Sequence, residues 1–259
     1  MKEVLVLGYH AVSDGWPSEY SVTPSRLKGQ LESLLRRGYR AMTFGDALGT
    51  PLSSKTVAIT FDDGFRSVVE RALPVLSDLG LPATVFAVTN AVGNETPMDC
   101  VGLDEWLGGP FEDELQSMSW AELEQLARAG WEIGSHTRTH SVLTDLDDAA
   151  LLGELRGSRE KCEQQTGRPC RSLAYPYGSF DDRVVRAARH AGYKAAATFG
   201  GRFHLSDPLR SPRVAVFRSD RPFRFKLKVS PWTRRLRASS VVPALAEKRP
   251  AIGRLGRRP

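Results

Sequence analysis

The strongest constraint on the fold is an alternation of short apolar segments with longer segments of helical pattern along most of the 259 residues. The apolar segments have the length and composition of buried strands. Strands are expected near residues 3–8, 40–44, 56–61, 83–88, 131–135, 171–175, 194–199 and 213–217. Strands that alternate with helices form parallel sheets whose faces the helices cover. Seven or eight such strands predict a (β/α) barrel.

Helix signals separate these strands. Thr23 and Pro24 have the residue types of an N-cap and a first helical residue, and Ser119 with Glu122 forms a capping-box pattern. Helices are expected over about 24–37, 66–79 (with Pro74 inside), 120–130, 147–166 and 181–190. Residues 90–117 lack clear periodicity, so they are expected to form a long loop or lid-like insertion.

The composition is that of an ordinary globular chain, with 41% hydrophobic and 25% charged residues. The three cysteines form no CxxC pair, and their odd number argues against a disulfide framework, so free thiols in a reducing compartment are expected. The apolar run near the N-terminus, about five residues, is too short for the core of a signal peptide. No segment approaches the roughly 20 apolar residues of a membrane span. We therefore expect a cytoplasmic protein.

The basic character is concentrated at the C-terminal end. From Arg221 onward the chain has twelve Lys or Arg residues and one acid, whereas the rest is net acidic. This difference predicts a domain over 1–217 and a basic C-terminal tail over 218–259. Apolar side chains lie between the cations, so the tail could contact the inner face of an anionic membrane. A solvated tail is the alternative, and binding to nucleic acid is not expected.

Polar side chains follow several of the predicted strands at the point where each strand ends. His10 ends the first strand, Asp62 and Asp63 end the strand over 56–61, and His136 follows the strand over 131–135. In barrels of this type the active site lies at the rim formed by the carboxyl ends of the strands. These separate segments are therefore expected to meet at one site.

Two histidines four residues apart indicate a metal site. His136 and His140 would lie on one face of a helical turn, where both imidazoles can reach one ion. The zinc-protease motif HExxH does not apply, because Thr137 stands in the place of its glutamate. Asp63 can complete a triad of two histidines and one carboxylate, and Asp62 can take the proton of a water molecule beside it.

The adjacent carboxylates of Asp62 and Asp63 need a special backbone to serve one site. Neighbouring strand residues point to opposite faces, so both can face the site only if the chain turns at the strand end. Gly64 would permit such a turn. An Asp-Gly turn without a cation is the alternative interpretation. Two imidazoles and a carboxylate suit Zn²⁺, and also Co²⁺, Ni²⁺ or Fe²⁺.

Three motifs in this chain resemble those of the polysaccharide deacetylase family, the NodB-homology or carbohydrate esterase family 4 enzymes. The first reads TFDDG over residues 60–64, and the second, H-[ST]-x-x-H, reads HTRTH over 136–140. The third, usually R-x-P-Y, reads AYPY over 174–177. The resemblance covers about residues 1–217. It implies a distorted (β/α) barrel and metal-dependent removal of N-acetyl groups from amino sugars.

The roles of individual residues follow from this resemblance by position. Asp62 matches the general base, and Asp63, His136 and His140 match the metal ligands. Tyr177 matches the residue whose backbone N–H helps to hold the oxyanion. The implied partner is an N-acetylated carbohydrate, and the implied cofactor is a divalent metal such as Zn²⁺.

The chain departs from the family pattern at two places. The arginine of the third motif, which orients the base in the family, is Ala174 here. The late motif with the acid histidine is not clear, and His10 and His204 are the candidates. His10 is preferred because it ends a strand. The sequence around it also resembles the YHxV opening of circularly permuted members that act on poly-N-acetylglucosamine-type exopolysaccharides.

These patterns predict a hydrolase that removes N-acetyl groups from an acetamido sugar of a polysaccharide or of its lipid-linked precursor. Two alternatives remain open. One is a catalytically inactive carbohydrate-binding member of the same fold, which Ala174 favours. The other is a hydrolase of a non-sugar amide.

Overall fold

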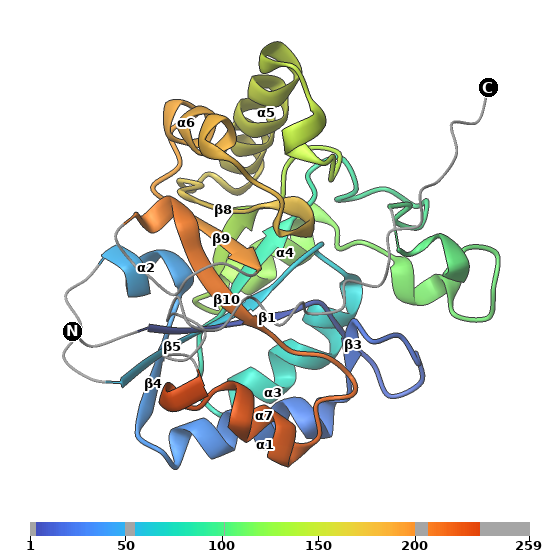
Figure 1. Ribbon diagram of the computed structural model, residues 1–259. Helices are drawn as coiled ribbons and strands as arrows, with labels where there is room; N and C mark the ends of the chain where they lie inside the picture. The colour runs from blue at the N-terminus through green and yellow to red at the C-terminus, as the bar shows by residue number, and fades with distance from the viewer. Residues whose placement is uncertain (1–3, 50–54, 101, 200–206, 234–259) are drawn as a thin grey trace.

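The computed structural model describes residues 4–49, 55–100, 102–199 and 207–233, and its centre is a closed parallel barrel (Figure 1). Among the described residues, seven strands form the ring. They are β1 (Val4–Tyr9), β5 (Lys55–Phe61), β6 (Thr84–Ala87), β7 (Glu132–Ser135), β8 (Ser172–Ala174), β9 (Ala195–Phe199) and β10 (Ser211–Ala215). The predicted (β/α) barrel of seven or eight strands is therefore confirmed.

Strand β1 closes the ring of seven strands, and an eighth strand lies outside it. It pairs with β5 from Val4 to Tyr9 on one side and with β10 at Leu7 and Gly8 on the other. An eighth strand, β4 (Tyr39–Met42), pairs with the first half of β5, whereas β6 pairs with its last residues. Strand β4 therefore lies beside the ring and is not a member of it.

Helices cover the outside of the barrel. The longer ones are α1 (Pro24–Leu35), α4 (Trp120–Arg128), α5 (Asp148–Thr166) and α6 (Asp182–His190). The shorter elements are α2 (Phe44–Gly49), α3 (Leu73–Asp78), α7 (Pro222–Lys228), β2 (Ala11–Val12) and β3 (Ser21–Val22). The predicted capping box of α4 is present, because Ser119 Oγ accepts from the backbone N–H of Glu122 and the Glu122 carboxylate accepts from that of Ser119.

The helix expected over 66–79 differs from the prediction at its centre. A five-residue π-helical segment, Val68–Ala72, precedes α3, which begins at Leu73 with Pro74 in its first turn. Proline cannot donate to the preceding turn, and its ring clashes with a regular α-helical carbonyl. A wider π turn before the proline avoids this conflict while keeping the chain helical.

Residues 90–100 and 102–117 form a packed insertion, drawn in green at the right of Figure 1. They contain two short 3₁₀ segments, Asp104–Trp106 and Glu112–Leu115. Met98, Leu103 and Leu115 are buried in one cluster with Trp16 and Phe65. The insertion therefore packs against the loops that follow β2 and β5, in a small core separate from the main one.

Helix α7 lies in the segment that the sequence analysis assigned to the basic tail. Its Phe225 and the following Val229 are almost fully buried in the main core cluster, together with residues of β1 and β10. The boundary at 217 stays a prediction, although the described part of the segment packs on the barrel. No helix in the described ranges combines the length and the apolar character needed to cross a bilayer.

Candidate active site

Three buried side chains from two strand ends form a compact cluster at the rim of the barrel. Asp63 follows β5, and His136 and His140 follow β7. Asp63 Oδ1 lies 3.4 Å from Nε2 of His136 and 3.5 Å from Nε2 of His140, and the two Nε2 atoms are 3.2 Å apart. Ligands of a tetrahedral Zn²⁺ with bonds of about 2.0–2.1 Å are separated by about 3.4 Å. The three atoms therefore have the spacing of a divalent-metal site.

The protonation of His136 suits a metal ligand. Its Nδ1 lies 2.8 Å from the carbonyl oxygen of Ala174, which can only accept, so Nδ1 carries the hydrogen. This tautomer leaves the Nε2 lone pair directed at Asp63 and His140. Burial lowers the pKa of His136 and holds the pKa of His140 well below its usual value. Both rings are therefore neutral at neutral pH, which is the form in which an imidazole binds a metal.

The segment between the two histidines is a loop and not the helical turn that the sequence analysis assumed. Thr137 and His140 have φ angles of 68° and 61°, values outside the right-handed helical region. The Thr137 hydroxyl accepts from the backbone N–H of His140, and the Glu154 carboxylate of α5 accepts from the N–H groups of residues 138 and 139. These hydrogen bonds hold a left-handed loop that brings the imidazoles together.

The turn predicted after β5 is present and begins one residue earlier than expected. Asp63 itself has φ 69°, and Gly64 has φ 78°. The backbone N–H of Gly64 donates to the carbonyl of Asp62 at 2.8 Å, which tightens the turn. The consecutive left-handed residues break the alternation of the strand, so Asp62 and Asp63 both face the interior of the site.

Arg213 of β10 supplies the guanidinium that Ala174 cannot. Its Nη1 and Nη2 donate to the two oxygens of Asp62 at 2.6 and 2.7 Å, and its side chain is completely buried. The guanidinium also lies 4.1 Å from the ring centre of Phe199. The sequence analysis missed this residue. The available signal was an arginine at the start of an otherwise apolar predicted strand, 213–217.

The two neighbouring aspartates have opposite electrostatic properties. Burial alone would raise the pKa of Asp62, but the charge of the Arg213 guanidinium and its hydrogen bonds lower it to about 2. For Asp63, burial and then the charge of Asp62 raise the pKa well above the usual value, and Oδ1 has no hydrogen-bond partner among the described residues. Asp63 is therefore the carboxylate that needs a cation, and Asp62 already has one.

His10 lies close to this pair at the end of β1. Its ring stacks on Phe199 at 5.9 Å between centres and contacts Tyr20 at 5.0 Å. Its Nδ1 is enclosed and has no hydrogen-bond partner in the described part of the chain. Burial lowers the pKa of His10 to about 4, against the opposing charge of Asp62. The other candidate, His204, lies outside the described residues.

Tyr177 lies against His140, one of the candidate metal ligands, in a tight turn after β8. It has φ 58°, and its ring meets that of His140 edge-on at 4.6 Å. Gly178 follows with φ 64°, and a Cβ there would lie 2.9 Å from the carbonyl oxygen of Phe199. The turn therefore requires glycine at 178 and places Tyr177 beside His140.

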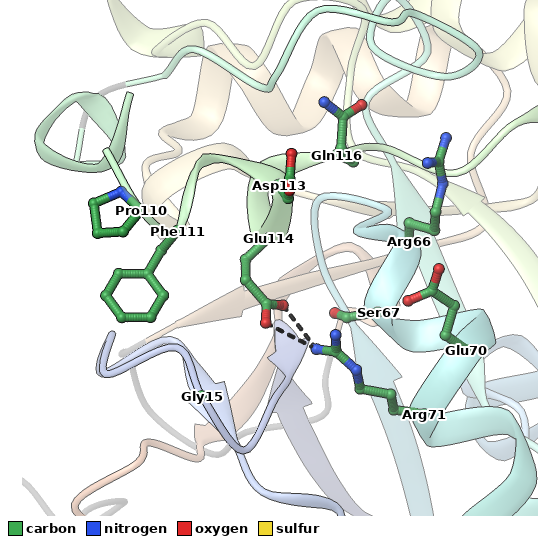
Figure 2. A pocket seen from close by; sticks show the side chains of 10 residues that line it. All are labelled: Gly15, Arg66, Ser67, Glu70, Arg71, Pro110, Phe111, Asp113, Glu114 and Gln116. Atoms are coloured by element: carbon green, nitrogen blue, oxygen red, sulfur yellow. Dashed lines mark hydrogen bonds and ion pairs between the residues drawn. The ribbon is translucent and has the colours of Figure 1, made fainter. Parts of the chain in front are cut away.

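A separate cleft of about 590 Å³ lies where the insertion meets the barrel (Figure 2). Arg71 and Glu114 point toward one another across it, 2.7 Å apart, and Ser13 also donates to Glu114. Its lining contains none of the candidate ligands or catalytic residues. The ion pair instead holds the insertion against the segment that follows β5.

Comparison with known proteins identifies the family. A model described as polysaccharide deacetylase matches residues 49–196, which is more than half of the chain. The chain therefore belongs to the polysaccharide deacetylase family, as its motifs predict. The matched range includes the candidate ligands and Tyr177, whereas His10 and Arg213 lie outside it.

Individual relatives agree with this assignment. The poly-beta-1,6-N-acetyl-D-glucosamine N-deacetylase of Staphylococcus aureus (strain MSSA476) is 27% identical over 188 residues, which cover 68% of this chain and 60% of that protein. The chain thus spans less than two thirds of the length of the curated relatives it matches.

Solved structures show the same fold. A polysaccharide deacetylase from Bacillus cereus is 26% identical with a TM-score of 0.71, and the match covers 88% of this chain and 69% of that one. IcaB from Ammonifex degensii has a TM-score of 0.69 at 22% identity, with 90% and 98% of the two chains covered. At this identity the second comparison supports the fold alone.

Proposed function

We propose that this protein is a metal-dependent hydrolase that removes N-acetyl groups from an acetamido sugar of a polysaccharide or of its precursor. The observation that carries the proposal is the Asp63–His136–His140 cluster beside a second carboxylate, Asp62, whose protonation is set by Arg213. The name of the Staphylococcus aureus relative supports a β-1,6-linked N-acetylglucosamine polymer as the first substrate to test.

Asp63, His136 and His140 would hold the metal, and Zn²⁺ fits their spacing and their mixture of nitrogen and oxygen ligands best. When bound, the ion supplies a Lewis acid that polarises the acetamide carbonyl and lowers the pKa of water. The Ala174 carbonyl contributes by fixing the His136 tautomer. The buried Asp63 charge would be neutralised by the ion it holds.

Asp62 would accept the proton of the attacking water. With a pKa of about 2 it is ionised across the physiological pH range, and the two hydrogen bonds from Arg213 fix its direction. A base that is already charged and already oriented loses little entropy when the substrate binds. Arg213 is therefore a positioning residue in this mechanism.

His10 would donate a proton to the leaving amine, and the Tyr177 backbone N–H would help to hold the oxyanion. At neutral pH the His10 ring is neutral because burial lowers its pKa to about 4. The proton that it delivers must therefore be taken up during the reaction, and the nearby Asp62 is the group that first receives one. Both roles rest on the family resemblance together with the position of these residues at the rim.

Arg213 argues against the alternative of a catalytically inactive carbohydrate-binding member of the same fold (the inactive-module alternative). This alternative was favoured by Ala174 in place of the family arginine, and Arg213 contacts the base in its stead. The non-sugar amide alternative has no specific observation in its favour. We further propose a cytoplasmic protein working at the inner face of the membrane, which is supported by the three free thiols and by the basic C-terminal sequence.

Calorimetric titration of the metal-stripped protein with Zn²⁺, followed by an acetate-release assay on poly-N-acetylglucosamine oligomers, tests the function. We expect one tight site in the wild type, its loss in Asp63→Ala, and acetate release that depends on added metal. Tight binding without acetate release from any acetylated sugar would favour the inactive-module alternative. Absence of binding would reject the metal-dependent mechanism.

A further inference from the structure

Helix α7 has two opposite apolar faces, and only one of them is covered by the protein. Phe225 and Val229 are buried, whereas Phe223 and Leu227 are 80% and 49% exposed. Residues four apart lie on one side of a helix, so Phe223 and Leu227 form one stripe, about opposite to the buried pair. Trp232, just beyond the helix, is 69% exposed. In the described ranges these three are the exposed large hydrophobic side chains.

The covered face is firmly anchored, so the exposed stripe has a defined orientation. Phe225 and Val229 belong to the main core cluster. Lys228 donates to the buried Asp220 carboxylate at 2.6 Å and to the carbonyl of Ala215 at 3.1 Å. These contacts tie α7 to the end of β10. The helix therefore cannot rotate to bury Phe223 and Leu227 without breaking a buried ion pair.

Cations flank the exposed stripe on both sides. By helical spacing, Lys226 lies on one side of the stripe and Arg224 on the other, and both are exposed. Two acids lie close to them. Asp220 is buried and already paired with Lys228 and Arg224, and the Glu19 carboxylate accepts from Ser219, whose hydroxyl accepts in turn from Arg224. Arg221, also exposed, precedes the helix. The surface made by Arg221, Phe223, Arg224, Lys226, Leu227 and Trp232 is therefore apolar at its centre and positive at its edges.

We infer that this surface docks the protein on the anionic face of a lipid bilayer. Aromatic rings and leucine enter the boundary between headgroups and acyl chains, while arginine and lysine extend to the phosphates. Charge complementarity selects this occupant, since the six residues of the surface include three cations and no acid, and the sequence after residue 233 adds eight cations and one acid. The inference assigns a surface to the membrane contact proposed above and rests on that proposal, but it does not depend on sugar deacetylation.

Vesicle flotation of the full chain tests the inference. We expect binding to phosphatidylcholine vesicles that contain about 30% phosphatidylglycerol, weaker binding at high salt, and none to pure phosphatidylcholine. The triple variant Phe223→Ser, Leu227→Ser, Trp232→Ser should bind about tenfold more weakly or worse. Lys226→Glu should also weaken binding, whereas the matched control Arg128→Glu, an exposed residue of α4, should not.

A second readout locates the contact and protects against misfolded variants. The Trp fluorescence of the wild type should shift to the blue with anionic vesicles, and Trp232→Phe should remove most of that shift while retaining binding. The substituted side chains are exposed, so the circular dichroism and melting temperature of the variants should match those of the wild type. Unchanged vesicle binding by the folded triple variant would overturn the inference in favour of charge attraction alone. Absence of vesicle binding by the wild type would also overturn it. If the wild type were then a dimer and the triple variant a monomer, the exposed stripe would be an interface between two copies of the chain.

Discussion

The candidate site has a metal side, formed by Asp63, His136 and His140, and an arginine side, formed by Asp62 and Arg213. The two sides place the same residue type, aspartate, in opposite environments. Asp63 is buried beside two neutral imidazoles and another carboxylate, and its pKa is raised well above the usual value. Asp62, one residue earlier, is held by a buried guanidinium, and its pKa is lowered to about 2. Two carboxylates one residue apart thus differ in their needs: Asp63 requires an exogenous cation, whereas Asp62 stays charged because Arg213 supplies one.

The difference between the two sides shows how a fold can assign roles to adjacent residues. A carboxylate whose positive partner belongs to the protein is permanently ionised and oriented, so it is always available to accept a proton, while its low pKa limits its strength as a base. A carboxylate without such a partner has a strong tendency to acquire an exogenous cation. The same reasoning predicts that equal substitutions at the two positions have unequal consequences.

The largest effect is expected from Asp63→Asn, which should affect both metal binding and activity. Asp63→Asn should abolish tight Zn²⁺ binding and reduce acetate release by about a thousandfold or more, because the amide is a weak neutral ligand. Asp62→Asn should reduce acetate release by about a hundredfold to ten-thousandfold while retaining the metal. Calorimetry and an acetate assay on both variants measure the two properties separately. Loss of metal in both variants would mean that the two sides do not act separately.

The same two substitutions, Asp63→Asn and Asp62→Asn, should change the stability of the metal-stripped protein in opposite directions. A raised pKa means that ionised Asp63 destabilises the fold as pH rises, so Asp63→Asn should raise the melting temperature at pH 7. A lowered pKa means that Asp62 stabilises the fold above its unfolded pKa, so Asp62→Asn should cost about 3 kcal/mol by leaving Arg213 unpaired. Thermal melts at pH 7 measure both shifts. Shifts of the same sign would contradict the assigned environments.

A smaller effect on turnover is expected from the arginine side alone. Arg213→Lys keeps the charge but loses the two parallel hydrogen bonds, so kcat should fall by about tenfold to a hundredfold with little change in KM. Zn²⁺ affinity should stay within about threefold of the wild type, since Arg213 contacts none of the ligands directly. An equal loss of metal affinity and of kcat would show that Arg213 supports the metal side instead.

The smallest effect is expected from a control substitution that lowers stability without touching the site. Ser119→Ala removes the N-cap hydroxyl of α4 and should cost about 1 kcal/mol. The acetate assay and Zn²⁺ titration should give wild-type values at a temperature well below the melting point. If this variant lost activity as Arg213→Lys does, the effect of the latter could be attributed to stability.

The amino-acid sequence determined the features that depend on neighbouring residues. Apolar segments separated by capped helices predicted the barrel, and polar residues at the strand ends predicted the rim where Asp63, His136 and His140 meet. These features are local, because strand patterns, N-caps and turns are set within a few residues. Even here the left-handed loop of His136–His140 was missed, since the same spacing also fits one helical turn.

Only the tertiary structure decided which distant group completes each part of the site. Closure of the ring between β1 and β10 brings Arg213 to Asp62, 151 residues away in the chain. The carbonyl of Ala174 fixes the His136 tautomer across neighbouring strands. The packing of Phe225 and Val229 likewise determines which face of α7 stays exposed. Burial and pairing depend on what the fold places around a residue, and the local sequence does not contain that information.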